Sequence, residues 1–182
     1  MPEPARAGLI SVVGGESTGK SSLARALGER LPAILVPEYL RTWVDQRGRV
    51  PEADEQAAVM ATHRAGEVSA LRGAERTGRS WVVSDSGPLM TAVYSIQYYN
   101  DASLLHQALE WTAHSDAVAW CQDDFPWQPD PQRDGAHART ETQRILATIF
   151  AENPGLPVLP VAGPLHQRVA SVVSAVDPHR RR

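Results

Sequence analysis

The feature that constrains this chain most is a glycine-rich segment near its start. Residues 14–21 read GGESTGKS, a full match to the pattern G-x-x-x-x-G-K-[ST]. Glycines let the backbone fold back so that its amide groups face inward and cradle a phosphate. The lysine can reach the β- and γ-phosphates, and the final hydroxyl can bind Mg²⁺. The residues predicted to bind ATP are Gly14, Gly15, Glu16, Ser17, Thr18, Gly19, Lys20, Ser21 and Ser22.

The segments on either side of this loop fit a P-loop. Residues 9–13 (LISVV) form a short apolar run, as expected of a buried central strand. Leu23, Leu27 and Leu31 recur at helical spacing after the loop, and Pro32 predicts the end of that helix. Strand, glycine loop and helix are the arrangement that phosphate binding requires.

Strands and helices alternate through the rest of the chain, which predicts an α/β fold with a parallel sheet covered on both faces. The further predicted strands are 34–36, 80–84, 117–120 and 157–161. The further predicted helices are 39–46, 51–76, 89–99, 102–114, 140–152 and 165–176, the 140–152 helix opening on a capping box formed by Thr140 and Gln143. We predict a single domain over 1–182, with a lid at about 122–144 and a C-terminal tail at 177–182.

Composition excludes several function classes. The chain has 182 residues and a net charge of -3, so the charge balance argues against a grip on nucleic acid based on bulk charge. A single cysteine, Cys121, gives no internal disulfide, and no apolar run reaches the ~20 residues of a membrane span. The expected location is the cytoplasm. The six histidines lack ligand spacing, so no zinc site is predicted.

The type of P-loop protein follows from what accompanies the loop. Lys20 is the only lysine among 18 basic residues, whereas the guanine-reading N-K-x-D motif of GTPases needs a second one. Hydrolytic ATPases carry a carboxylate directly after the aspartate that ends the third predicted strand, but here Asp85 is followed by Ser86. An AAA+ ATPase also needs a lid subdomain, for which the chain leaves little room. Phosphoryl transfer to an organic hydroxyl remains.

Four segments in order resemble one family. They are the loop with its first helical turn at 14–25, then 37–41 (PEYLR), 85–95 (DSGPLMTAVYS) and 124–135 (DFPWQPDPQRDG). Together they resemble the ribosylnicotinamide kinase domain of the bacterial NadR proteins. The resemblance implies a five-stranded parallel sheet of order 2-3-1-4-5, and ATP- and Mg²⁺-dependent phosphorylation of the 5′-hydroxyl of nicotinamide riboside, a step of NAD salvage.

The sequence departs from this family in two places. The H-x-G-H signature of the adenylyltransferase domain is absent, so the resemblance implies kinase activity only. Gly87 stands where an acidic residue is expected, two positions after Asp85. That departure bears on the metal or substrate site.

Two carboxylates and an arginine are the candidates at the carboxyl ends of the strands, where open α/β sheets bind ligands. Asp85 is predicted to be catalytic, either by holding Mg²⁺ or as the base, and otherwise to cap the next helix. Glu38 is predicted to orient the ribose or act as the base, and otherwise to be a solvated carboxylate at a helix start. Arg41 either contacts substrate or pairs with Glu38.

The lid and two helix positions supply further candidates. Arg133 is predicted to stabilise the transferring phosphoryl group, and Arg139 and Arg144 either share that role or lie exposed on their helix. Asp123, Asp124 and Asp130 either favour a cationic pyridinium ring or merely solvate a loop. Tyr94 and Tyr98 either stack a base or belong to the core, and Gly163-Pro164 resembles an adenine-edge loop.

Two alternative functions stay open at this point. One is kinase action on another nucleoside or on a nucleic-acid end. The other is a regulatory module that binds ATP without turnover. A small-molecule nucleoside is the predicted partner, and the sequence does not predict an oligomeric state.

Overall fold

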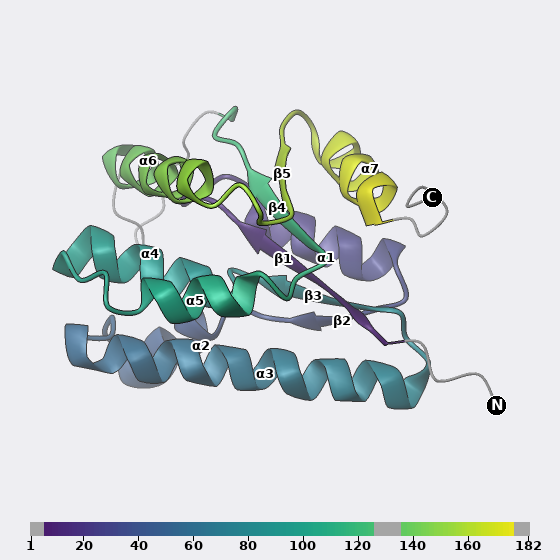
Figure 1. Ribbon diagram of the computed structural model, residues 1–182, viewed down its shortest axis with the longest axis horizontal. Helices are drawn as coiled ribbons and strands as arrows, with labels where there is room; N and C mark the ends of the chain where they lie inside the picture. Colours follow the sequence, from purple (N-terminus) through teal and green to yellow (C-terminus); the bar gives the residue numbers. More distant parts are fainter. Residues whose placement is uncertain (1–5, 126–135, 177–182) are drawn as a thin grey trace.

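A computed structural model describes residues 6–125 and 136–176 (Figure 1). The strands are β1 (Gly8–Val13), β2 (Ala33–Val36), β3 (Trp81–Asp85), β4 (Ala117–Cys121) and β5 (Val158–Val161). The helices are α1 (Lys20–Arg30), α2 (Tyr39–Arg47), α3 (Gln56–Thr77), α4 (Pro88–Tyr99), α5 (Leu105–Thr112), α6 (Ala136–Glu152) and α7 (Leu165–Val176), with a 3₁₀ turn η1 (Ala53–Glu55) before α3.

The five strands form one parallel sheet in the order β2-β3-β1-β4-β5, so the predicted order is confirmed. The β1 strand is central and buried at every position, as its apolar sequence predicts. Its neighbours are β3 and β4, with Val12 opposite Asp85 of β3 and Val13 opposite Trp120 of β4. The ends of β1, β3 and β4 therefore meet at one edge of the sheet, beside the glycine loop.

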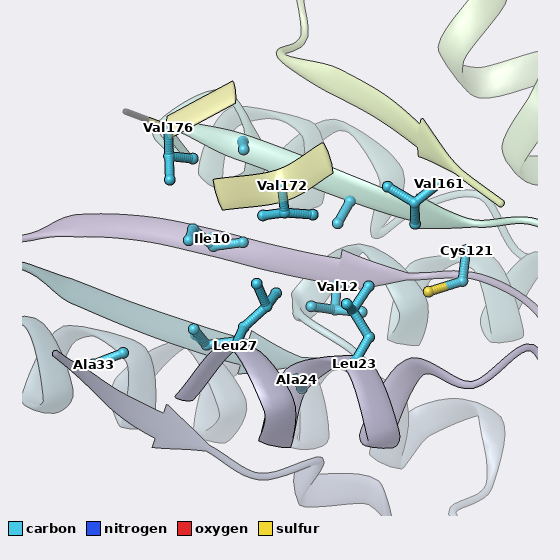
Figure 2. Packing of buried hydrophobic residues seen from close by; sticks show 13 residues of the cluster. Ile10, Val12, Leu23, Ala24, Leu27, Ala33, Cys121, Val161, Val172 and Val176 are labelled. Carbon is cyan, nitrogen blue, oxygen red and sulfur yellow. The ribbon is translucent and has the colours of Figure 1, made fainter. Parts of the chain in front are cut away.

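Helices cover both faces of the sheet because alternate strand residues point to opposite sides. Ile10 and Val12 pack on one face with residues of α1 and α7, such as Leu23 and Val172 (Figure 2). On the other face, Val13 packs with Met60 of α3 and with residues of α4 and α6. Burying apolar side chains on both faces is the main stabilising contribution, at about 25 cal/mol per Å².

Three predicted helix starts are wrong. The segment after Pro51 opens with η1, which has a capping box between Glu52 and Glu55, and α3 follows it. The α5 helix begins at Leu105, after a turn in which Asp101 accepts a hydrogen bond from the Ser103 amide. The α6 helix begins at Ala136, so Thr140 and Gln143 lie inside it rather than forming its capping box. Within the described ranges, no helix combines the length and apolarity that a bilayer crossing demands.

Candidate functional site

The glycine loop joins β1 to α1 and adopts a backbone that few side chains allow. Gly14 and Gly19 have φ angles of 146° and 85°, and Ser17 also lies in the left-handed region at 56°. A Cβ on Gly14 would lie 2.8 Å from the carbonyl oxygen of Cys121. Both the φ angle and the close approach of β4 therefore require glycine at position 14.

Lys20 is the first residue of α1, and its side chain turns back over the loop. Its Nζ donates a hydrogen bond to the carbonyl oxygen of Gly15 at 3.0 Å, and the residue is only 9% exposed. The Thr18 hydroxyl donates to the same carbonyl at 2.8 Å. These two hydrogen bonds hold the loop closed around the lysine, at the N-terminus of an 11-residue helix whose dipole favours an anion.

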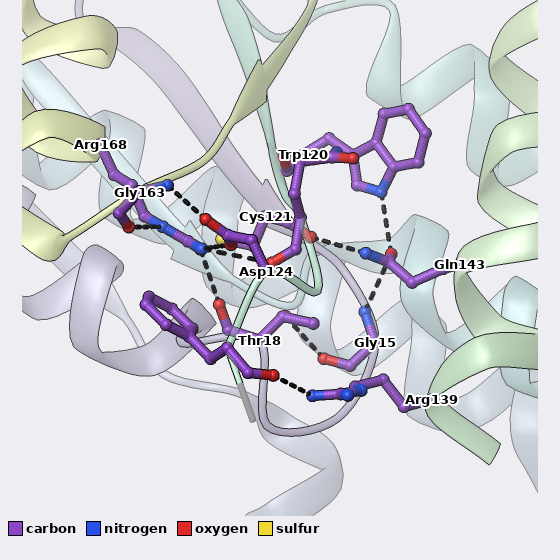
Figure 3. A network of polar contacts seen from close by, with 11 residues as sticks. Gly15, Thr18, Trp120, Cys121, Asp124, Arg139, Gln143, Gly163 and Arg168 are labelled. Carbon is purple, nitrogen blue, oxygen red and sulfur yellow. Dashed lines mark hydrogen bonds and ion pairs between the residues drawn. The ribbon is translucent and has the colours of Figure 1, made fainter. Parts of the chain in front are cut away.

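Gln143 of α6 supports the loop from the side of β4 (Figure 3). Its Oε1 accepts hydrogen bonds from the Gly15 amide (3.3 Å) and from the indole N–H of Trp120 (2.9 Å). Its Nε2 donates to the carbonyl of Cys121 at 2.9 Å. One buried amide therefore fixes the loop against the end of β4.

Arg168 of α7 supports the loop from the opposite side and is 1% exposed (Figure 3). Its guanidinium donates to the carbonyls of Thr18 (2.8 Å) and Gly163 (2.8 Å) and forms an ion pair with Asp124. It also lies 4.2 Å from the ring centroid of Phe125. A single cation thus connects the P-loop, the segment after β4 and the β5–α7 loop.

Asp85 ends β3 and is only 7% exposed. Strand alternation places its side chain on the face of Val83, which is the face that α1 covers. Among the described residues, its Oδ1 has no hydrogen-bond partner. A buried carboxylate oxygen without a partner fits an acceptor for a cation or its water ligands, so Asp85 and Ser21 suit Mg²⁺. Gly87, not Asp85, occupies the N-cap position of α4, so the capping alternative for Asp85 is wrong.

Glu38 lies at the N-cap position of α2 but makes no capping hydrogen bond with its side chain. Burial raises the pKa of the Tyr94 hydroxyl well above its ordinary value, and the negative charges of Glu38, Glu16 and Asp85 raise it further. All three carboxylates therefore lie near one buried phenol of α4. Glu38 follows β2 and Asp85 ends β3, and these strands are neighbours, so both predicted carboxylates lie at the carboxyl edge of the sheet, the edge of the P-loop.

Gly87, which stands where the resemblance leads us to expect an acidic residue, lies next to a carboxylate from α3. A Cβ at Gly87 would lie 3.3 Å from Oε1 of Glu67 and 3.3 Å from Oγ of Ser11. Glu67 is 1% exposed, and burial raises its pKa, against the opposing effect of hydrogen bonds from Ser84 and Arg64. A carboxylate from α3 thus occupies the space that a side chain at position 87 would need.

The arginine candidates have different surroundings. Arg139 packs against Gly15, whose Cβ would lie 2.9 Å from the Arg139 Cγ, and donates from Nη1 to the carbonyl of Phe125 at 3.0 Å. Arg144 lies exposed on α6 and pairs with Glu141 at 2.6 Å. Arg41 is exposed, and within the described ranges it forms no ion pair with Glu38.

The aromatic and acidic candidates also differ in burial and in their contacts. Tyr94 belongs to the buried cluster under α4, whereas Tyr98 is 45% exposed, with ring centroids 6.2 Å apart. Asp124 pairs with Arg168, and Asp123 is exposed. Arg133, Asp130 and the rest of 126–135, the middle of the predicted lid, lie outside the described residues.

Sequence patterns do not identify the residues that support the loop. The pattern around Gln143 predicts a capping box, and Arg168 lies within the amphipathic helix α7. Arg168 contacts Thr18 across 150 positions of the chain, and Gln143 contacts Gly15 across 128. A polar residue on the buried face of a helix was the one available signal.

The fold of this chain is similar to the folds of several solved structures. A crystal structure of NadR protein in complex with NR matches 94% of this chain and 51% of that chain, at a TM-score of 0.74 and 19% identity. A structure of NadR protein in complex with NAD and AMP-PNP matches 93% and 49%, at a TM-score of 0.70 and 19% identity. Thymidylate kinase from Ehrlichia chaffeensis matches 94% and 99%, at a TM-score of 0.64 and 15% identity. The chain spans about half the length of the NadR chains that it matches.

The loop and the sheet order define a P-loop protein with the fold of these structures, which confirms the expected resemblance at the level of the fold. A family model described as an AAA domain (AAA_28) matches residues 9–168. The chain therefore belongs to that family. A search of curated proteins gives no match.

Proposed function

We propose that this protein is an ATP-dependent kinase that phosphorylates the 5′-hydroxyl of nicotinamide riboside to give the mononucleotide. The observation that carries the proposal is that Glu38 follows β2 and Asp85 ends β3, two neighbouring strands, at the same edge of the sheet as Lys20 and the P-loop. A phosphoryl donor and a hydroxyl acceptor need sites that lie next to each other. The similarity in fold to NadR protein in complex with NR supports the choice of acceptor.

The roles of the donor side follow from position. Loop amides and the Lys20 ammonium bind the β- and γ-phosphates, and Lys20 follows the phosphoryl group as charge moves to the leaving oxygen. Ser21 and Asp85 would hold Mg²⁺, which neutralises phosphate charge when bound. Arg139, beside Gly15, and Arg133 are the arginines that we assign to the transferring group.

The acceptor side is assigned to Glu38. Its carboxylate accepts the proton of the 5′-hydroxyl as that oxygen forms a bond to the γ-phosphorus. The bond from phosphorus to the β–γ bridging oxygen breaks at the same time, and ADP leaves with the electron pair. Exclusion of water from this step is the role that we assign to the predicted lid at about 122–144.

Charge favours a cationic acceptor over a polyanion. The charges of Glu38, Glu16 and Asp85 add to the effect of burial in raising the pKa of the Tyr94 hydroxyl, which supports a negative field around that group. A negative field attracts the pyridinium ring of nicotinamide riboside and repels the phosphates of a nucleic-acid end. This argument ranks the nucleoside above the nucleic-acid alternative.

An acceptor panel with γ-labelled ATP tests the proposal. The panel contains nicotinamide riboside, its reduced form, thymidine, thymidylate and a 5′-hydroxyl oligonucleotide. The reduced riboside is the matched control because it has nearly the same shape and lacks the ring charge. We expect transfer to nicotinamide riboside with a KM about tenfold below that of the reduced form, a difference of ~1.4 kcal/mol. Transfer to thymidylate or the oligonucleotide instead, or ATP binding without any acceptor, contradicts the proposal.

The variant Glu38→Gln tests the acceptor role of Glu38. Loss of a general base or ribose contact is expected to lower transfer by about 100-fold. ATP affinity, measured by calorimetry, is expected to stay within about twofold. Reduced ATP affinity with full transfer at saturating ATP would mean that Glu38 serves the donor side.

A further inference from the structure

A series of hydrogen-bonded polar groups connects the start of α2 to the end of β3. The Tyr39 amide donates a hydrogen bond to Nδ1 of His63 at 3.3 Å, and Nε2 of His63 lies 2.8 Å from the Ser84 hydroxyl. His63 is 3% exposed, and Ser84 is fully buried. Tyr39 follows Glu38 directly, and Ser84 precedes Asp85 directly, so the imidazole bridges the neighbours of both predicted carboxylates.

The hydrogen bonds determine which ring nitrogen of His63 carries the proton. Because Nδ1 accepts the Tyr39 N–H, it carries no proton, and the proton of the neutral ring is on Nε2. Nε2 therefore donates to the Ser84 oxygen, which leaves the Ser84 hydrogen free for Glu67. Burial lowers the pKa of His63 to about 4, so the ring stays neutral near pH 7.

Glu67 is the last member of this series of polar groups and lies on α3, one helical turn after His63. Its Oε2 accepts a hydrogen bond from Arg64 at 2.9 Å. Its Oε1 lies 3.9 Å from Nε2 of His63 and has no hydrogen-bond partner in the described part of the chain. Three polar side chains buried on one face of the sheet, His63, Ser84 and Glu67, are costly to desolvate, so a requirement other than packing has to explain them.

We attribute their burial to the need to hold the Glu38 and Asp85 carboxylates at a fixed distance from each other. Glu38 belongs to a segment that packs on α3, whereas Asp85 is fixed by the ladder between β3 and β1. Ser84 and Asp85 point to opposite faces, so His63 can hold the strand end from the α3 side while Asp85 faces the P-loop. A shift of about 1 Å between reacting groups can cost on the order of 100-fold in rate.

We propose that His63 is a positioning residue that holds the Glu38–Tyr39 segment at a fixed distance from the Ser84–Asp85 strand end, with the Tyr39 amide fixing its tautomer. The inference rests on the proposed function, since it assigns Glu38 to the acceptor. It extends that function to a residue that touches neither substrate. Its specific consequence is that the loss of the Tyr39 contact affects acceptor binding and leaves ATP binding intact.

Three replacements of His63 separate the two contacts. The amide oxygen of His63→Asn can take the place of Nδ1 and keep the Tyr39 contact. The amide nitrogen of His63→Gln can take the place of Nε2 and keep the Ser84 contact, and His63→Leu keeps neither. The matched control is Ser11→Ala, which removes the buried 3.1 Å contact between the Ser11 and Ser115 hydroxyls on the same face of the sheet.

The measurements are the KM values for both substrates, kcat and the melting temperature. We expect His63→Leu to raise the KM for nicotinamide riboside by about tenfold with the KM for ATP within about twofold, and His63→Asn to recover most of that loss. Ser11→Ala is expected to lower the melting temperature without raising the KM for nicotinamide riboside relative to the KM for ATP. The proposal is overturned if the acceptor KM of His63→Leu stays within about twofold of wild type, or if it follows melting temperature across all variants.

A separate readout distinguishes failure of the positioning role from failure of the proposed function. If the wild-type protein phosphorylates no member of the acceptor panel, the proposed function is wrong. Hydrogen exchange at 38–41 then decides the positioning role. Faster exchange in His63→Leu than in Ser11→Ala supports it, and equal exchange overturns it.

Discussion

The buried imidazole of His63 predicts a loss of stability in mild acid. Burial lowers its pKa from 6.5 to about 4 in the folded protein, whereas the unfolded chain keeps the ordinary value. Between these two values the unfolded state binds more protons, so stability falls as pH falls. The contribution is fully present above the unfolded pKa and is lost as pH falls toward the folded one.

The size of this loss of stability follows from the pKa shift of His63. A change of one pKa unit corresponds to about 1.36 kcal/mol, so the full titration is worth about 3 kcal/mol, of which about 2 kcal/mol falls between about pH 7 and about pH 5. The neighbouring Glu67 works in the opposite sense. Its raised pKa gives stability at low pH that is lost as pH rises. Against a total of about 5–15 kcal/mol, a change of about 2 kcal/mol is measurable.

Urea unfolding of wild type and His63→Gln at both pH values isolates the imidazole. Glutamine does not titrate, and Glu67 with the exposed histidines is present in both proteins, so the double difference removes their contributions to first order. We expect wild type to lose about 2 kcal/mol more than the variant on going from about pH 7 to about pH 5. A double difference below about 0.5 kcal/mol refutes the link between burial and the lowered pKa.

Three further predictions concern the nucleotide side. Lys20→Ala is expected to lower transfer by at least about 100-fold in a labelled-ATP assay, because a charge that follows the phosphoryl group is lost, and activity within about tenfold of wild type would contradict this. Asp85→Asn is expected to raise the Mg²⁺ concentration needed for half-maximal rate, since an amide is a weaker ligand, whereas an unchanged Mg²⁺ titration would exclude Asp85 from the metal site. Arg168→Met is expected to reduce the free energy of unfolding in urea by about 3 kcal/mol, through loss of the bonds to Thr18 and Asp124, and a change below about 0.5 kcal/mol would show that these bonds add no net stability.

The sequence alone determined the parts of this protein that depend on local pattern. The apolar run of β1, the positive-φ glycines of the loop and the helical spacing of α1 each act within about one element, so their residue types specify them directly. Alternation of strands and helices then requires a parallel sheet with right-handed crossovers. The same alternation places Glu38 and Asp85 at the carboxyl edge.

The tertiary structure decided how that edge is held. Arg168 on Thr18, Gln143 on Gly15 and His63 on Ser84 join residues from distant parts of the chain, and a hydrogen bond of that kind leaves no periodic trace in sequence. The role of Gly87 was also undetermined until the backbone brought Glu67 of α3 against it. Burial settles these partners, because a polar group removed from water must find a partner wherever the fold places one.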